Sequence, residues 1–264
     1  MKRRLAIILL VFSFSSSANA QHFTHDIGFF IGGTSLQTDY GQRGDFSSNF
    51  SNQGLSFTIA HYLHFFNRNM RWSAKDEMYN YIMVKTEINY IGNRQLVHFG
   101  KFANSNSESG KRLRAMKGSV SMINFGINLE YYFKNLEEFI FPYSNIRFNP
   151  FISFGGRFVV YNNDLSSDLG DWREDRSILP EKYRPQQALD IGTGTTFAAT
   201  LSAGIRYKFT ENLDLSTQIS YQYFFSDSVD GLTSKTFENK NNEVLLNFQL
   251  GIIYHLNFSS PLFY

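Results

Sequence analysis

The sequence predicts an all-β protein, a closed antiparallel transmembrane β-barrel that follows a cleaved signal peptide. Three observations lead to this prediction: a secretory leader, an aromatic-rich chain of low mean hydropathy, and long segments in which apolar and polar residues alternate. Aromatic residues make up 17% of the chain, yet the mean hydropathy is −0.28. No apolar run reaches the roughly 18 residues of a membrane helix. Strands with lipid-facing apolar and lumen-facing polar side chains account for both properties.

Residues 1–20 have the three parts of a secretory signal peptide. The segment begins with Lys2, Arg3 and Arg4, continues with a short apolar run over 5–14, and ends in Ala18-Asn19-Ala20. Small residues at −3 and −1 are typical of a cleavage site. The apolar run is too short to cross a bilayer, which takes roughly 20 residues as a helix. We therefore expect cleavage after Ala20, which leaves residues 21–264 as the barrel.

The charge balance gives no support for nucleic-acid binding. The precursor has 25 Lys and Arg against 23 Asp and Glu, and removing the three basic residues of the leader leaves 22 against 23. A chain without net positive charge has no general attraction for nucleic acid. The chain also has no Cys, which excludes both disulfides and a lipid-anchored lipoprotein.

The last strand has the clearest pattern. Its apolar positions are Phe248, Leu250, Ile252, Tyr254, Leu256 and Phe258. The positions between them are mostly polar or small, and successive side chains of a strand face opposite sides. One face is therefore wholly apolar. The segment is close to the roughly 9–11 residues with which a tilted strand crosses a bilayer.

The preceding segments repeat this alternation. Residues 197–209 and 213–225 form two long alternating runs joined by the short polar turn 210–212, which indicates a hairpin. Five further segments alternate less cleanly: 25–34, 54–66, 79–92, 118–133 and 148–161. The even total of eight strands fits a closed bacterial barrel without an unpaired edge in lipid. Ten strands are the alternative, with the extra ones in 67–78 or 134–147.

The connections between these strands alternate in length. The long ones are 35–53, 93–117, 162–194 and 226–242, and the shorter ones are 67–78, 134–147 and 210–212. Outer-membrane barrels have long outer loops and short periplasmic turns. With the N-terminus inside, all four long connections fall outside. The main alternative is a soluble β-sandwich or lipocalin-like barrel, whose apolar face would point inward.

Three stretches carry a resemblance to a known group. They are LSAGIRYKFTENLDLSTQISYQYFF at 201–225, SDSVDGL at 226–232 and HDIGFFIGG at 25–33. They resemble small outer-membrane barrels of the Bacteroidota, in particular an uncharacterised flavobacterial family of the porin-family, OmpX-like and PorT-like group. Some PorT-like barrels are tied to the type IX secretion machinery. The resemblance implies the fold and the outer-membrane location, and it carries no catalytic motif onto this chain.

The predicted lumen face carries charges of both signs. They are Asp26, Lys85, Glu87, Glu130, Arg157, Arg206, Lys208, Asp214 and His255. An eight-stranded barrel is just wide enough for side chains to fill it, and a lone buried charge is costly. We therefore expect a paired polar network that fills the lumen. The alternative is a polar conduit in a barrel with more strands.

No arrangement for catalysis or metal binding stands out. His98 lies in an outer loop with Ser105, Ser107 and Ser109 nearby in sequence, but no spacing there places a nucleophile beside an oriented base. His61 and His64 face opposite sides of a strand because they are three residues apart. The acidic residues of loop 162–194 lack the regular spacing of a calcium loop. We expect no enzyme, no metal and no cofactor.

The second of the long outer connections is basic. Its basic residues are Arg94, Lys101, Lys111, Arg112, Arg114 and Lys117, against Glu108 alone. Arg and Lys pair with phosphate, so this loop could contact lipopolysaccharide. It could equally pair with the acidic loop 162–194 across the rim.

The sequence thus predicts a non-enzymatic integral outer-membrane barrel that acts structurally or binds through its outer loops. Its expected partners are outer-membrane lipid, lipopolysaccharide and envelope proteins. A component of a secretion or envelope-assembly machine is one alternative, by analogy only. A narrow porin for small solutes is the other.

Overall fold

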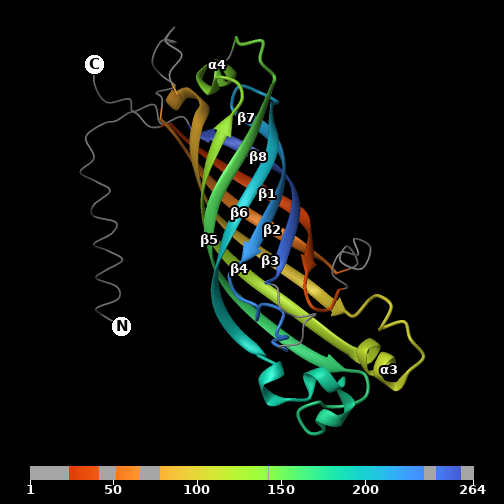
Figure 1. The fold of residues 1–264 in the computed structure, drawn as a ribbon. Coiled ribbons are helices and arrows are strands. Elements are labelled where there is room, and N and C mark those ends of the chain that lie inside the picture. Colours follow the sequence, from red (N-terminus) through yellow and green to blue (C-terminus); the bar gives the residue numbers. More distant parts are fainter. Residues whose placement is uncertain (1–23, 42–51, 66–77, 142, 235–241, 257–264) are drawn as a thin grey trace, which may run out of the picture.

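Eight antiparallel strands close into one barrel (Figure 1). The computed structural model describes residues 24–41, 52–65, 78–141, 143–234 and 242–256, so the predicted leader lies outside the described residues. The strands are β1 Thr24–Gln37, β2 Gln53–His64, β3 Ile82–Val97, β4 Met116–Tyr132, β5 Phe148–Ser167, β6 Gly192–Lys208, β7 Leu213–Phe224 and β8 Val244–Leu256. The predicted fold class and the number of strands are confirmed.

The first and last strands pair directly and close the barrel. Ile27 of β1 lies opposite His61 of β2 on one side and Tyr254 of β8 on the other. Every other strand pairs with its neighbours in sequence. The ten-stranded alternative is therefore wrong. The connection 134–147 holds the short helix α4 (Leu136–Ile140) in place of a strand, whereas most of 67–78 lies outside the described residues.

The apolar faces of the strands point outward. In β8, Phe248, Leu250, Ile252 and Tyr254 are 45–53% exposed, whereas His255 in the same strand is 2% exposed. The other strands show the same parity, which produces a band of exposed apolar side chains around the barrel. Such a band belongs in hydrocarbon. The soluble alternative required the opposite parity and is wrong.

Four strands continue past the apolar band. β5 has 20 residues; at roughly 3.3 Å per residue and a tilt of roughly 40° it rises about 50 Å, twice a band of roughly 25 Å. Beyond the band, the outward positions of β4, β5 and β6 are polar, as at Ser121, Asn162 and Thr193. The polar extension of β3–β6 thus reaches beyond the hydrocarbon.

This extension corrects the predicted boundaries. β3 continues to Val97, β4 begins at Met116, β5 continues to Ser167 and β6 begins at Gly192, so parts of the predicted loops 93–117 and 162–194 are strand. The prediction relied on apolar outward residues, and that signal ends where the lipid ends. β3 also begins later than predicted, because Met78–Tyr81 form the 3₁₀ turn η2.

The two ends of the barrel differ in their coverings. The short-turn end carries the β2–β3, β4–β5 and β6–β7 connections with α4, and the long-loop end carries α3 (Glu108–Ala115) and three 3₁₀ turns (Figure 1). These turns are η3 (Arg176–Ile178), η4 (Glu181–Tyr183) and η5 (Gln186–Ala188). No helix among the described residues is long and apolar enough to cross a membrane.

A charge placed in the apolar band should destabilise the barrel. Ile127 lies mid-band on β4 and is 64% exposed, so Ile127→Lys should lower the free energy of unfolding in a bilayer by about 2–4 kcal/mol. Ser121→Lys, on the same face of the same strand but beyond the band, should cost under about 1 kcal/mol. Urea titrations read by heat-dependent gel mobility measure both, and equal losses would contradict the position of the band.

Candidate functional site

The interior near the short turns is organised around Arg206 of β6, whose side chain is fully buried. Its Nη2 lies 3.2 Å from Asp26 Oδ2 and 2.8 Å from Asp214 Oδ2. Its Nε also donates to Asp214 Oδ2 at 3.1 Å. One guanidinium thus links carboxylates from β1 and β7. Such donors in a fixed plane suit two carboxylates better than a single ammonium does.

Two histidines extend this arrangement to β2 and β8. His64 Nε2 lies 2.6 Å from Asp26 Oδ2. His255 bridges the two carboxylates, with Nδ1 2.8 Å from Asp26 Oδ1 and Nε2 3.2 Å from Asp214 Oδ2. The network therefore joins five strands and includes both strands of the closing pair. His64 was expected to face away from His61 but was not included in the predicted network.

A second ionic group fills the middle of the lumen. Lys85 Nζ lies 3.0 Å from Glu87 Oε2 and 3.7 Å from Glu130 Oε1. Arg157 pairs with Glu87 and also donates to Gln222 Oε1 at 2.7 Å. All four charged side chains are buried. The described strands thus bury four acidic and four basic side chains in the lumen, which balances the formal charge without the histidines.

Lys208 lies inside the barrel but contacts the β4–β5 connection. Its Nζ donates to the carbonyl oxygen of Phe141 at 2.8 Å and lies 5.3 Å from the ring centroid of Phe139. Helix α4 buries three apolar side chains, each at most 2% exposed: Leu136, Phe139 and Ile140. They pack inside the barrel against the strand residues Tyr62, Tyr132 and Phe151. The β4–β5 connection therefore closes the short-turn end with an apolar cluster.

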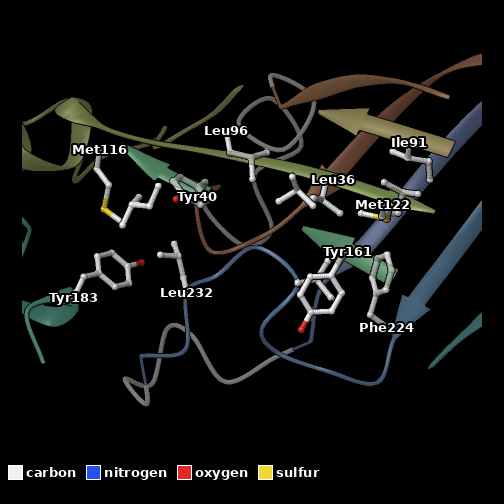
Figure 2. Packing of buried hydrophobic residues seen from close by; sticks show 14 of the residues in the cluster. Leu36, Tyr40, Ile91, Leu96, Met116, Met122, Tyr161, Tyr183, Phe224 and Leu232 are labelled. Carbon is white, nitrogen blue, oxygen red and sulfur yellow. The ribbon is translucent and has the colours of Figure 1, made fainter. Parts of the chain in front are cut away.

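A larger apolar cluster closes the long-loop end (Figure 2). Strand residues such as Ile91, Met122 and Phe224 pack with loop residues such as Tyr183 and Leu232. The cluster needs small residues beside its aromatic rings: a Cβ on Gly118 would lie 2.4 Å from the Tyr40 hydroxyl. Neither apolar cluster was predicted, because inward apolar residues do not stand out in strands whose outer face is also apolar.

The outer loops are joined to one another and to β5 by a β-bridge and by hydrogen bonds. Leu189 and Leu232 form a β-bridge between the β5–β6 and β7–β8 connections. Asp190 N donates to Gly231 O at 3.0 Å, and Asn163 Nδ2 donates to Ser228 O at 3.0 Å. Gly231 adopts a φ of 83°, which a side chain would disfavour. These contacts fold the loops inward over the mouth.

His98 is buried between two aromatic rings. Its ring centroid lies 4.6 Å from that of Tyr40 and 5.9 Å from that of Tyr183. Burial, helped by the charge of Lys182, lowers the pKa of His98 to about 3. Ser107 is occupied as the cap of α3, where its hydroxyl accepts from Gly110 N. His98 therefore packs as a neutral ring, and the described contacts do not join it to the nearby serines.

The six basic residues of the predicted lipopolysaccharide loop lie in different surroundings. Arg94 and Lys117 belong to β3 and β4 and not to a loop, and the side chain of Arg94 lies outside the described residues. Lys117 pairs with Asp168 at 2.7 Å, and Lys111 pairs with Glu108 at 2.8 Å. Arg114 donates to the carbonyl oxygens of Ala103 and Ser105. Lys101 is exposed and Arg112 is half-buried. The Lys117–Asp168 pair joins the neighbouring ends of β4 and β5.

The polar extension has an open edge on β6. β6 pairs with β5 from Gly192 onward, but its first paired position with β7 is Ala198 opposite Phe224. Phe225 N donates to Phe197 O, so odd-numbered residues of β6 direct their backbone groups toward β7. Thr193 and Thr195 therefore present N–H and C=O groups that no described residue pairs in the β7 direction. An open strand edge is a template for another strand.

Comparisons with known proteins find only distant structural likenesses. No family model matches the chain, and no curated protein matches it. Among solved structures, Neisserial surface protein A is 11% identical with a TM-score of 0.47 and covers 88% of this chain and 97% of its own. The attachment invasion locus protein Ail of Yersinia pestis, crystallised with sucrose octasulfate, is 10% identical with a TM-score of 0.44, covering 89% and 99%.

A third similar structure is a major outer membrane protein from Thermus thermophilus, 12% identical with a TM-score of 0.44, covering 87% of this chain and 99% of its own. These likenesses are too distant to argue a shared activity. The narrower resemblance to flavobacterial barrels gains no support from them and stays a prediction.

Removing Arg206 should expose how strongly the lumen network is coupled. Arg206→Met leaves Asp26 and Asp214 without their shared cation, which should lower the free energy of unfolding by about 3–5 kcal/mol. Adding Asp214→Asn should cost at least about 1 kcal/mol less than the sum of the two single changes, because the partners are in contact. Urea titrations of the four variants in one detergent measure this, and additive losses would show that the pair acts independently.

Proposed function

We propose that this protein is an integral outer-membrane barrel that does not conduct and has no catalytic role, and that it binds another protein through its polar extension. The observation that carries the proposal is the open edge of β6, which lies beyond the apolar band. The secretory leader and the lipid-facing exterior support the outer-membrane location.

The content of the lumen supports a closed barrel. Paired charges fill the middle, and apolar clusters that include loop residues lie at both ends. Water-filled channels belong to wider barrels, whereas eight strands leave an interior that side chains fill. A narrow porin is therefore the weaker candidate.

The open edge supports a partner with an extended segment. Strand addition uses backbone hydrogen bonds for affinity and alternate side chains for specificity. Thr193 and Thr195 offer such backbone groups, and their side chains face outward beside Asn162, whose Oδ1 accepts from Thr193 Oγ1 at 3.1 Å. An envelope protein or a secretion component could supply the strand, which retains the assembly-machine alternative as one kind of partner.

Lipopolysaccharide contact by the basic residues is a second, weaker proposal. Lys117, Lys111 and Arg114 already have partners within the protein. Lys101 and Arg112 reach the surface, and Lys101 also has a contact within the protein, so a phosphate would compete with internal contacts at most of these residues.

The closed lumen predicts the absence of steady conductance. The purified barrel should add no stable current steps in a planar bilayer, because its apolar ends exclude hydrated ions. A wide porin measured in the same bilayers is the control. Reproducible current steps from the wild-type protein would refute the closed lumen.

The open edge predicts a partner that depends on the backbone of Thr195. A photo-crosslinking residue at Asn162 should capture a partner in intact cells, and Thr195→Pro should reduce that adduct at least about fivefold, because proline removes the edge N–H. Thr195→Val keeps this N–H and should leave the yield unchanged. Loss of the adduct in both variants, or in neither, would show that the partner does not use the edge.

A further inference from the structure

Asp230 occupies the centre of the outer loops. The residue is 1% exposed, and its Oδ2 accepts from Asp39 N at 3.0 Å while its Oδ1 accepts from Leu232 N at 2.8 Å. The first contact ties the β7–β8 connection to the β1–β2 connection, and the second shapes the turn that carries Leu232. Leu232 in turn bridges to Leu189. One carboxyl group thus holds three outer connections together.

A second buried carboxyl group lies against the first. Glu243, immediately before β8, is 4% exposed. Its Oε1 accepts from Asp230 N at 3.3 Å, and its Oε2 is buried without a hydrogen-bond partner among the described residues. Burying two ionised carboxylates this close together is costly, because like charges repel and an ionised carboxylate can only accept hydrogen bonds.

The charged surroundings do not favour ionisation of the pair. Asp227 in the same connection adds negative charge beside both carboxyl groups, and Asp39 and Asp164 add negative charge near the neighbouring Tyr40. Burial and the nearby Asp230 raise the pKa of Tyr40 well above its usual value, so this phenol is neutral. Among the described residues, no Lys, Arg or His forms an ion pair with either carboxyl group.

We infer that Asp230 and Glu243 share one proton and act as a pH-dependent latch, which holds the outer loops over the mouth under acidic conditions and loosens when both groups ionise. This inference stands whether or not the polar extension binds a partner. The latch concerns only the outer loops, because the ionic groups of the lumen lie on the strands.

The direction of the titration agrees with the geometry. Burial raises the pKa of Asp230 to about 7, against the lowering effect of the Leu232 and Asp39 N–H groups. Burial and the charge of Asp230 raise the pKa of Glu243 well above its usual value. An unperturbed aspartate has a pKa of about 3.9, so the closed latch binds more protons than the open one between roughly pH 4 and pH 7. Closing should weaken as pH rises through this range, roughly tenfold per unit, and then level off.

Hydrogen exchange of the latched N–H groups tests the inference. In the full barrel in detergent, the protection of the Asp39 and Leu232 N–H groups, corrected for intrinsic rates, should fall by up to roughly 100-fold from pH 5 to pH 8. The N–H of Gln249, inside β8, is the reference and should keep its protection. Constant protection of Asp39 and Leu232 over this range would overturn the latch, as would an equal loss at Gln249.

An isosteric substitution separates the shared proton from simple packing. Glu243→Gln supplies a permanent N–H to the Asp230 carboxylate, so protection at pH 8 should stay within about threefold of that at pH 5. Glu174→Gln, at an exposed acidic residue of the β5–β6 connection, is the control and should behave as wild type. Asp230→Asn serves as a second variant if Glu243→Gln fails to fold by gel mobility. A variant at the pair that keeps the full wild-type pH response would refute the shared proton.

Discussion

An eight-stranded barrel has an interior just wide enough for side chains to fill, and every strand of this protein contributes to that interior. Its outer face is committed to apolar side chains, so the charged residues of the strands must lie inside, where water is scarce. A buried charge without a partner is costly. Arg206 meets this requirement by pairing with both Asp26 and Asp214. Because the three residues come from β6, β1 and β7, the same ion pairs also hold these strands together.

Different parts of the chain close the two ends of the lumen. Apolar side chains from α4 close the short-turn end, and loops that fold inward close the long-loop end. Both ends of the lumen are thus covered. Beyond the apolar band, β3–β6 continue outward as the polar extension. β7 ends at Phe224, where the chain turns inward over the mouth, and no described residue pairs with Thr193 or Thr195 on the β7 side of β6. The inward turn of the chain after β7 thus contributes both to the closed lumen and to the open edge of β6.

The fold could be predicted from the sequence because the bilayer imposes a period of two on every strand. Residues 248–258 show this most clearly, and the same parity in the other strands assigned Arg206, Lys85 and Glu130 to the lumen. The polar extension escaped prediction because water accepts polar side chains such as Ser121 and Asn162 on the outer face, which removes the contrast between faces. The predicted strands therefore end where the lipid-facing residues end, whereas the strands in the structure end where the hydrogen bonding between them ends.

Alternation is a local property of the chain, so the order of residues alone predicts a barrel of eight strands with an apolar exterior and a charged interior. Which charges meet is visible only in the folded barrel. His255 contacts Asp26 across 229 positions of the sequence, and Asp230 receives the N–H of Asp39 across 191. Such pairs depend on barrel closure and on how the loops fold over the mouth, and no periodic pattern in loops encodes them.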